Sequence, residues 1–134
     1  MRKRAALLLA LLSGCAAPTL RLRIAAGNNT NYGGPLYMVV RKTDRDSFLT
    51  EDYDTLAGTV LGKSDPAILR RVIIWPKDQQ EVKVVKQKAE DVVGVYFFYS
   101  TPGRSWRFAV LDPTVKRMSV RLGTNEIQSV EPDK

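Results

Sequence analysis

Residues that commonly carry chemistry are sparse in this sequence. Its 134 residues include no histidine and one cysteine, which removes most transition-metal sites and the usual pairs of nucleophile and base. No glycine-rich phosphate-binding loop is present either. What remains is an acidic group within residues 44–54, formed by Asp44, Asp46, Glu51, Asp52 and Asp54. Such a group could bind calcium or supply the paired carboxylates of a glycoside hydrolase.

The acidic group is better explained as a polar loop and the start of a helix. It lacks the spacing of an EF-hand loop and the glycine that such a loop needs. Carboxylates are also favoured in the first turn of a helix, because the helix dipole is positive there. We therefore predict no catalytic residue, no metal site, no small-molecule substrate and no enzymatic activity.

The single cysteine ends a pattern that indicates export. Positions 2–4 are basic and residues 5–12 form an apolar run, far shorter than the roughly 20 residues that a membrane-spanning helix needs. The run ends in Leu12-Ser13-Gly14-Cys15, which resembles the lipobox of bacterial lipoproteins. We expect residues 1–14 to be a signal peptide that is removed, and Cys15 to receive diacylglyceryl and palmitoyl chains.

Acylation of Cys15 would decide where the domain works. Each buried methylene contributes about 0.8 kcal/mol, so two or three acyl chains anchor a protein stably whereas one chain does so marginally. Residues 15–19 would then be a short lipidated tether. Because Ala16 stands where inner-membrane lipoproteins most often have Asp, we expect the periplasmic face of the outer membrane. No cofactor besides the covalent lipid is expected.

The charge of the chain does not indicate a nucleic-acid partner. The formal net charge is +7, and three of the basic residues belong to the expected signal peptide. Most other lysines and arginines alternate with apolar residues, where they would face solvent and discourage edge pairing of strands.

From residue 20 onward the dominant hydrophobic period is two, which is typical of strands. Alternating or apolar runs occur at residues 20–24, 36–41, 72–75, 82–86, 92–99, 106–111 and 118–122. About seven short strands predict an all-β, immunoglobulin-like sandwich of two sheets over residues 20–130, followed by a polar tail at 131–134. Residues 92–99 are apolar on both parities and should form a central strand with one face in the core and the other face either covered or turned toward a partner.

Residues 50–61 break the period of two. Thr50 can cap a helix, Glu51 and Asp52 suit its first turn, and apolar residues at 53, 56, 57 and 60 fall on one face. We predict a short helix inserted between two strands.

Several segments together resemble TssJ, the family of outer-membrane lipoproteins of type VI secretion systems. The sequence NYGGPLYMVVR at 31–41 is similar to the loop and the apolar second strand of that family. Phe48 and the helix from Thr50 resemble its helical insertion, and Ile74-Trp75-Pro76 resembles a strand end. Residues 93–99 resemble its central strand, and PGRSWR at 102–107 its Trp-Arg strand start. A short first loop and a more aromatic segment at 96–99 mark a divergent member.

This resemblance implies a transthyretin-like sandwich that holds the periplasmic C-terminal region of the inner-membrane protein TssM. It also implies that the loop between the first two strands, residues 27–35, makes the contact. Carried over by position, the contact residues are Asn28, Asn29, Asn31 and Tyr32, which offer three polar groups and one aromatic anchor. A plain turn explains the same residues, since turns require Asn and Gly.

We accordingly predict a non-enzymatic lipoprotein that tethers a TssM-like component to the outer membrane within the type VI secretion membrane complex. The alternative is a periplasmic ligand-binding or assembly lipoprotein of another envelope system, which would present a concave apolar pocket. A lipoprotein hydrolase is the weakest possibility, because the sequence lacks the residues for it.

The lipobox leads to a first prediction. Cys15→Ser should abolish metabolic labelling with a palmitate analogue, because a serine hydroxyl cannot form the thioether to diacylglycerol. The variant should be found unprocessed or in the soluble periplasmic fraction. Labelling that persists in the variant would show that Cys15 is not the acylated residue.

Overall fold

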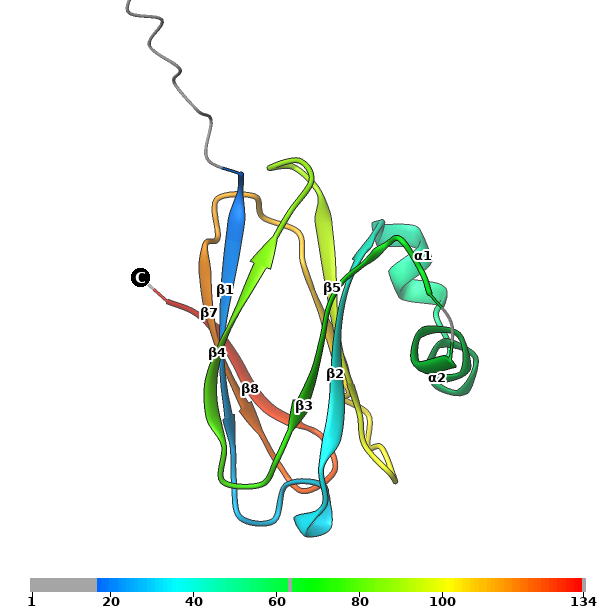
Figure 1. Cartoon of the computed structure of the whole chain (residues 1–134), viewed down its shortest axis with the longest axis vertical. Coiled ribbons are helices and arrows are strands. Elements are labelled where there is room, and N and C mark those ends of the chain that lie inside the picture. The colour runs from blue at the N-terminus through cyan, green and yellow to red at the C-terminus, as the bar shows by residue number, and fades with distance from the viewer. Residues whose placement is uncertain (1–16, 63, 134) are drawn as a thin grey trace, which may run out of the picture.

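The computed structural model describes residues 17–62 and 64–133, which build two four-stranded sheets. The first sheet has the strand order β4-β1-β7-β8 and the second the order β3-β2-β5-β6, and the two face each other (Figure 1). The strands are β1 (Thr19–Ala26), β2 (Leu36–Thr43), β3 (Ile68–Ile74), β4 (Gln79–Val85), β5 (Val92–Phe98), β6 (Arg107–Val110), β7 (Arg117–Leu122) and β8 (Ile127–Pro132). The predicted two-sheet β-sandwich is confirmed.

Strand β1 is an interior strand of the first sheet. It pairs antiparallel with β4 and parallel with β7, whereas the other strand pairs of both sheets are antiparallel. Leu20, Leu22 and Ile24 of β1 are buried in the core, while Arg23 on the opposite face is exposed. This alternation suits a sheet that packs on one face and meets solvent on the other.

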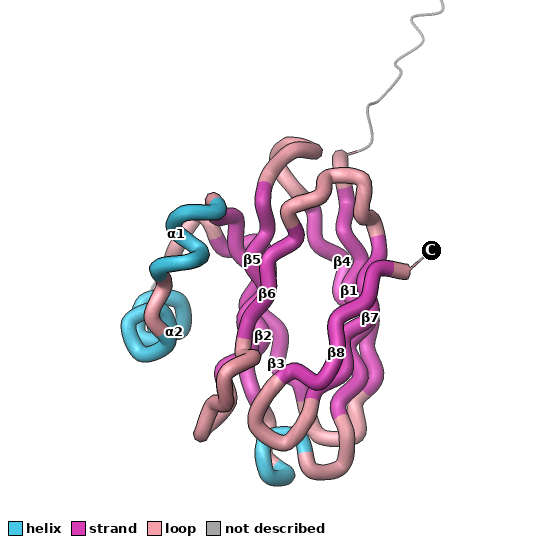
Figure 2. The backbone as a smooth tube through the Cα atoms, turned by 180° about the vertical axis from the view of Figure 1, so that it is seen from behind, coloured by secondary structure: helices cyan, strands magenta, loops and turns pink. Residues whose placement is uncertain are grey.

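Strand β5 lies between β2 and β6, and residues 93–99 are all buried. One face of β5 packs in the core between the sheets. The other face is covered by two short helices, α1 (Arg45–Thr50) and α2 (Tyr53–Gly62), which lie on the side of the second sheet away from the first (Figures 1 and 2). The prediction of a central strand is confirmed, and its second face is the covered one.

Aromatic rings join the helices to the sheet. Tyr53 of α2 lies 5.6 Å from the Phe98 ring and 4.9 Å, edge to face, from the Trp106 ring. Phe48 of α1 lies 6.1 Å from the Tyr96 ring. The Tyr96 ring lies over Gly94. A side chain at position 94 would clash with it, because a Cβ built there would lie 2.4 Å from the Tyr96 hydroxyl oxygen. Each such ring pair contributes about 0.5–1.5 kcal/mol beyond the burial of its area.

A polar junction around Glu51, between the two helices, completes this cover. The Tyr96 hydroxyl donates to Glu51 Oε2 over 2.6 Å, and Arg41 Nη1 donates to Oε1 over 2.9 Å. Arg107 Nη1 lies 3.6 Å from Oε2. Burial, followed by the hydrogen bond to Glu51, raises the pKa of Tyr96, so its hydroxyl stays a neutral donor. Arg41 also binds Asp65, which follows α2, over 3.1 Å, and thereby holds the insertion at its middle and at its C-terminal end.

The insertion differs from the single helix that the sequence predicts over residues 50–61. Asp44 caps α1 by accepting from the Ser47 amide over 2.8 Å, and Asp52 caps α2 by accepting from the Thr55 amide over 3.2 Å. Thr50 is therefore the last residue of α1 and not a cap. Helix α1 is not predicted from the sequence because it buries none of its residues, so no apolar period marks it.

Strand β8 is also absent from the sequence analysis. It pairs with β7 at the edge of the first sheet and includes residues 131–132, which the sequence analysis places in the polar tail. Its burial pattern contains one fully buried residue, Ile127, because backbone pairing with β7 holds an edge strand that needs few apolar side chains. Among the described residues, no helix is long and apolar enough to cross a membrane.

The Glu51 junction leads to a second prediction. Glu51→Ala should lower the free energy of unfolding by about 1–3 kcal/mol, because the Tyr96 hydroxyl loses its acceptor and the Arg41 and Arg107 guanidinium groups lose this carboxylate. Chemical denaturation measures this loss. Glu90→Ala, at an exposed position, is the control and should change stability by about 0.5 kcal/mol or less. Equal effects of the two substitutions would contradict a role for the junction.

Candidate contact site

The loop of residues 27–35, the predicted contact loop, joins β1 to β2. It lies at the end of the sandwich opposite the first described residues (Figure 1). The eight residues of β1 separate the two ends, which corresponds to about 25 Å at about 3.3 Å per residue. A partner bound to this loop would therefore be held well away from any tether that precedes β1.

The backbone of the contact loop is held in a conformation that most residues avoid. Asn31, Tyr32 and Gly33 have φ angles of 49°, 53° and 85°. The left-handed region costs a residue with a side chain about 1–2 kcal/mol; Asn tolerates it better than most, and a large aromatic residue is an outlier there. Such strain persists only where the surroundings enforce it, and it gathers at functional positions.

Asn31 provides part of that enforcement. Its side chain is buried, and its Nδ2 donates to the Pro35 carbonyl over 2.8 Å while its Oδ1 accepts from the Ser100 amide over 2.9 Å. Thr30 is buried as well and donates to the Leu122 carbonyl over 3.2 Å. Asn31 thus shapes the loop and is not the adaptable surface group that the sequence predicts. Thr30 and Ser100 escape sequence analysis because their partners are 92 and 69 positions away.

The other three predicted contact residues lie on the surface. Asn28 and Asn29 are exposed, and the Tyr32 side chain is 66% exposed. A hollow of about 330 Å³ lies beside Asn28 and Asn29 and reaches the turn between β7 and β8 at Gly123. An exposed aromatic ring next to adaptable polar groups is the composition that protein interfaces favour. Their role in binding stays a prediction.

The residues of the acidic group have structural roles in the helical insertion. Asp44 and Asp52 cap the helices and Glu51 joins them to the sheet, while Asp46 and Asp54 lie in the first helical turns. Hydrogen bonds from Ser47 lower the pKa of Asp44, as a cap requires. Within residues 17–62 and 64–133, no three His, Cys, Asp or Glu side chains gather to hold a metal ion. Cys15 lies outside the described residues.

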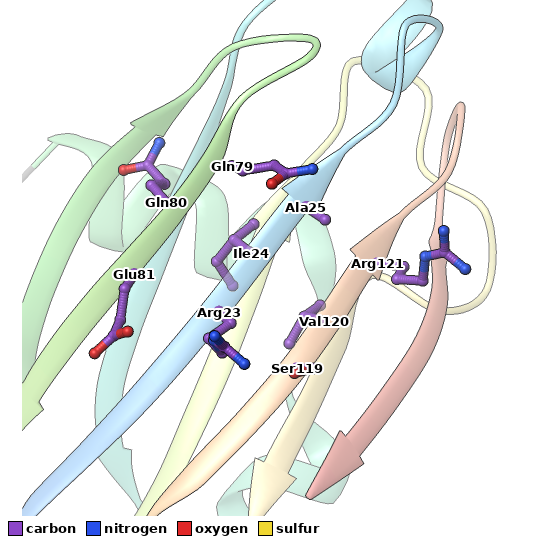
Figure 3. A pocket seen from close by; sticks show the side chains of 9 residues that line it. All are labelled: Arg23, Ile24, Ala25, Gln79, Gln80, Glu81, Ser119, Val120 and Arg121. Carbon is purple, nitrogen blue, oxygen red and sulfur yellow. The ribbon is translucent and has the colours of Figure 1, made fainter. Parts of the chain in front are cut away.

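The outer face of the first sheet carries a groove of about 410 Å³ (Figure 3). Small side chains, Ala25 of β1 and Ser119 of β7, leave the hollow, and Gln79, Glu81 and Arg121 surround it. The neighbouring charges form ion pairs across the sheet, such as Arg21 with Glu81 at 2.9 Å. This groove is a surface between polar side chains and differs from the concave apolar pocket that a ligand-binding protein would present.

The hydrogen bonds that Asn31 makes in the contact loop lead to a third prediction. Asn31→Ser should lower the free energy of unfolding by about 1–3 kcal/mol, because the shorter side chain cannot reach both Pro35 and Ser100. Asn28→Ser, in the same loop but exposed, should change it by about 0.5 kcal/mol or less. Urea denaturation measures the free energies of unfolding of the two variants. A neutral Asn31→Ser variant would mean that the loop is held by its other bonds.

Comparison of the fold with solved structures finds proteins of type VI secretion systems. The lipoprotein TssJ1 from Pseudomonas aeruginosa matches with a TM-score of 0.70 and 15% identity, over 89% of this chain and 98% of that chain. Lip from Serratia marcescens, a membrane-bound component, matches with a TM-score of 0.65 and 17% identity, over 89% and 98%. A chain described as the TssM C-terminal domain from EAEC matches with a TM-score of 0.66 and 20% identity, over 86% and 98%.

The resemblance to TssJ lipoproteins is thereby confirmed at the level of the fold. No curated protein matches the sequence. A family model does match residues 37–122, from the second strand to the end of the seventh. Because this match covers more than half of the chain, the protein belongs to the family described as IglE, N-terminal domain.

Proposed function

We propose that this protein is a non-enzymatic lipoprotein that links the outer membrane to a TssM-like inner-membrane protein within a type VI secretion membrane complex. The observation that carries the proposal is the exposed position of the Tyr32 ring on the contact loop. The fold holds this residue in a left-handed conformation and leaves its ring largely exposed, at the end of the sandwich away from the start of β1. Backbone strain of this kind gathers at functional positions, which supports a role in binding for the exposed ring.

The relatives in fold support the choice of system. Two of them are described as a lipoprotein and as a membrane-bound component of type VI secretion systems, and a further neighbour is described as a type VI membrane complex. The proposal extends this association to the present chain. Its partner would be the periplasmic C-terminal region of the TssM-like protein, bound through the contact loop.

The mechanism would be passive tethering. Acyl chains on Cys15 would hold the start of the domain at the outer membrane, and the contact loop would hold the partner. Strand β1 begins at Thr19 and the contact loop follows directly after Ala26, so both attachment points flank the same strand. A pull between membrane and partner would run along the covalent backbone of β1, while its pairing with β4 and β7 keeps that strand within the fold.

The fourth prediction tests the contact loop. Replacing Asn28, Asn29 and Tyr32 together with Ser should weaken binding of the periplasmic C-terminal region of the cognate TssM-like protein about 30-fold, since an aromatic anchor contributes about 2 kcal/mol. The thermal midpoint should stay unchanged, because all three side chains are exposed. Affinity is measured with full-length protein from detergent-solubilised membranes.

A matched control carries Gln87→Ser, Lys88→Ser and Leu111→Ser, three exposed positions outside the contact loop. It should bind as the unmodified protein does. Unchanged affinity in the contact-loop variant would move the interface elsewhere on the domain, and absence of binding by the unmodified protein would refute the proposed partner.

A further inference from the structure

A strip of exposed apolar side chains lies beside the contact loop. Tyr37 of β2 and Ile73 of β3 face each other across the strand pair and are 48% and 45% exposed. Trp75 is the first residue after β3 and is 54% exposed, and the exposure pattern of Ile73, Ile74 and Trp75 (exposed, buried, exposed) continues the alternation of the strand and indicates the same face. We name Tyr37, Ile73 and Trp75 the distal apolar strip.

The strip is the part of the outer sheet face that the helices leave bare. In the neighbouring rows, Val39 and Tyr96 are fully buried beneath the insertion. Phe98 is opposite Tyr37 in the pairing of β2 with β5 and is still buried, with the Tyr53 ring packed on it. The cover therefore ends between Phe98 and Tyr37, although the apolar character of the face continues to Ile73 and Trp75.

The strip and the contact loop are structurally one unit. The turn after β3 hydrogen-bonds to the start of the contact loop, because the Lys77 amide donates to the Gly27 carbonyl over 3.2 Å. The Ala26 amide donates to the Asp78 carbonyl in the same place, over 2.9 Å. Figure 1 shows this turn and the contact loop at the same end of the sandwich. A partner bound to the contact loop would therefore lie next to the turn that follows Trp75.

Single exposed apolar residues are ordinary, but a contiguous group that includes tryptophan marks a contact surface. Among the described residues, the other large apolar side chains exposed outside the contact loop lie on separate elements. Leu49 and Leu61 lie on different helices, Val85 ends β4 and Leu111 follows β6. Tryptophan and tyrosine are also the residues that most often contribute the binding energy of an interface.

We propose that the distal apolar strip and the contact loop form one composite surface for a protein partner. The partner's complementary surface would carry aliphatic or aromatic side chains at its centre and a carboxylate at its rim. Lys77 supplies the charge for that carboxylate, since its ammonium group has no ion pair among the described residues. This inference rests on the proposed function, because the partner is the same periplasmic region that the contact loop would bind.

The strip would bind by packing of side chains and not by addition of a strand to β3. The free edge of β3 is bridged to β4, because Arg70 donates to the Lys83 carbonyl over 2.9 Å and Gln80 donates to the Ile73 carbonyl over 3.4 Å. Strand addition to β3 needs the edge carbonyls of that strand, and the bond from Gln80 occupies the carbonyl of Ile73. A lipid surface is a poor occupant too, since the strip lies at the end away from the start of β1.

The test compares two double variants of the full-length protein in detergent. Ile73→Ser with Trp75→Ser removes two of the three side chains of the strip, and Val85→Ser with Leu111→Ser removes two side chains of similar exposure, 48% and 51%, outside it. The probe is the purified periplasmic C-terminal region of the cognate TssM-like protein. We expect the strip variant to bind at least about tenfold more weakly and the control to differ by about twofold or less. Both should keep the thermal midpoint of the unmodified protein.

Two further variants make the result specific. Trp75→Phe should retain most of the affinity, because an aromatic ring remains, and Lys77→Glu should weaken binding in a salt-dependent manner. Unchanged affinity in the strip variant, with weakened binding in the contact-loop variant, would overturn the composite surface and leave the proposed function intact. Absence of binding by the unmodified protein would overturn both. Self-association of the unmodified protein in sedimentation velocity that the strip variant abolishes would assign the strip to a second copy instead.

Discussion

The cover over the outer face of β5 is the constraint on which the rest of this structure depends. Strand β5 is apolar on both faces, so a two-layer sandwich alone would leave half of it in water. The helical insertion resolves this by laying aromatic rings on the sheet, and Glu51 holds the insertion down through Tyr96, Arg41 and Arg107. A charged group beside an apolar face costs solvation, which these three partners offset by donating hydrogen bonds or supplying positive charge.

The same cover determines which surface stays available. It reaches Phe98 and stops, so the outer face nearest the contact loop keeps Tyr37 and Ile73 exposed. The charged outer face of the first sheet has the opposite character, because ion pairs such as Arg21 with Glu81 occupy it and water solvates it. The outer face of the first sheet is thus solvated, and the outer face of the second sheet is covered by helices as far as Phe98. Exposed apolar side chains and the contact loop lie together at one end of the sandwich.

The fold follows from the sequence where a side-chain pattern repeats. The period of two in residues 20–24 and the double-sided apolar run at 92–99 predict β1 and β5 because burial alone produces those patterns. Helix α1 and β8 leave no such pattern, since a cap at Asp44 and backbone pairing with β7 hold them. In the candidate site, the contact loop is proposed from the resemblance to TssJ, and the sequence cannot separate Asn31 from Asn28. A tertiary contact with Ser100, together with a local bond to Pro35, holds Asn31 inward.

The position of β1 would suit the proposed link between two membranes. If the two attachment points flanked different strands, a pull would act on the hydrogen bonds between those strands and could peel the sheet apart. Here the expected tether precedes Thr19 and the contact loop follows Ala26, so the covalent chain takes the load. The loop must then resist straightening, which would unwind Asn31, Tyr32 and Gly33 from their left-handed conformations. The bonds of Thr30 to Leu122 and of Asn31 to Ser100 oppose this by fastening the loop to β7 and to the segment after β5, so in the proposed link the buried loop residues would matter as much as the exposed ones.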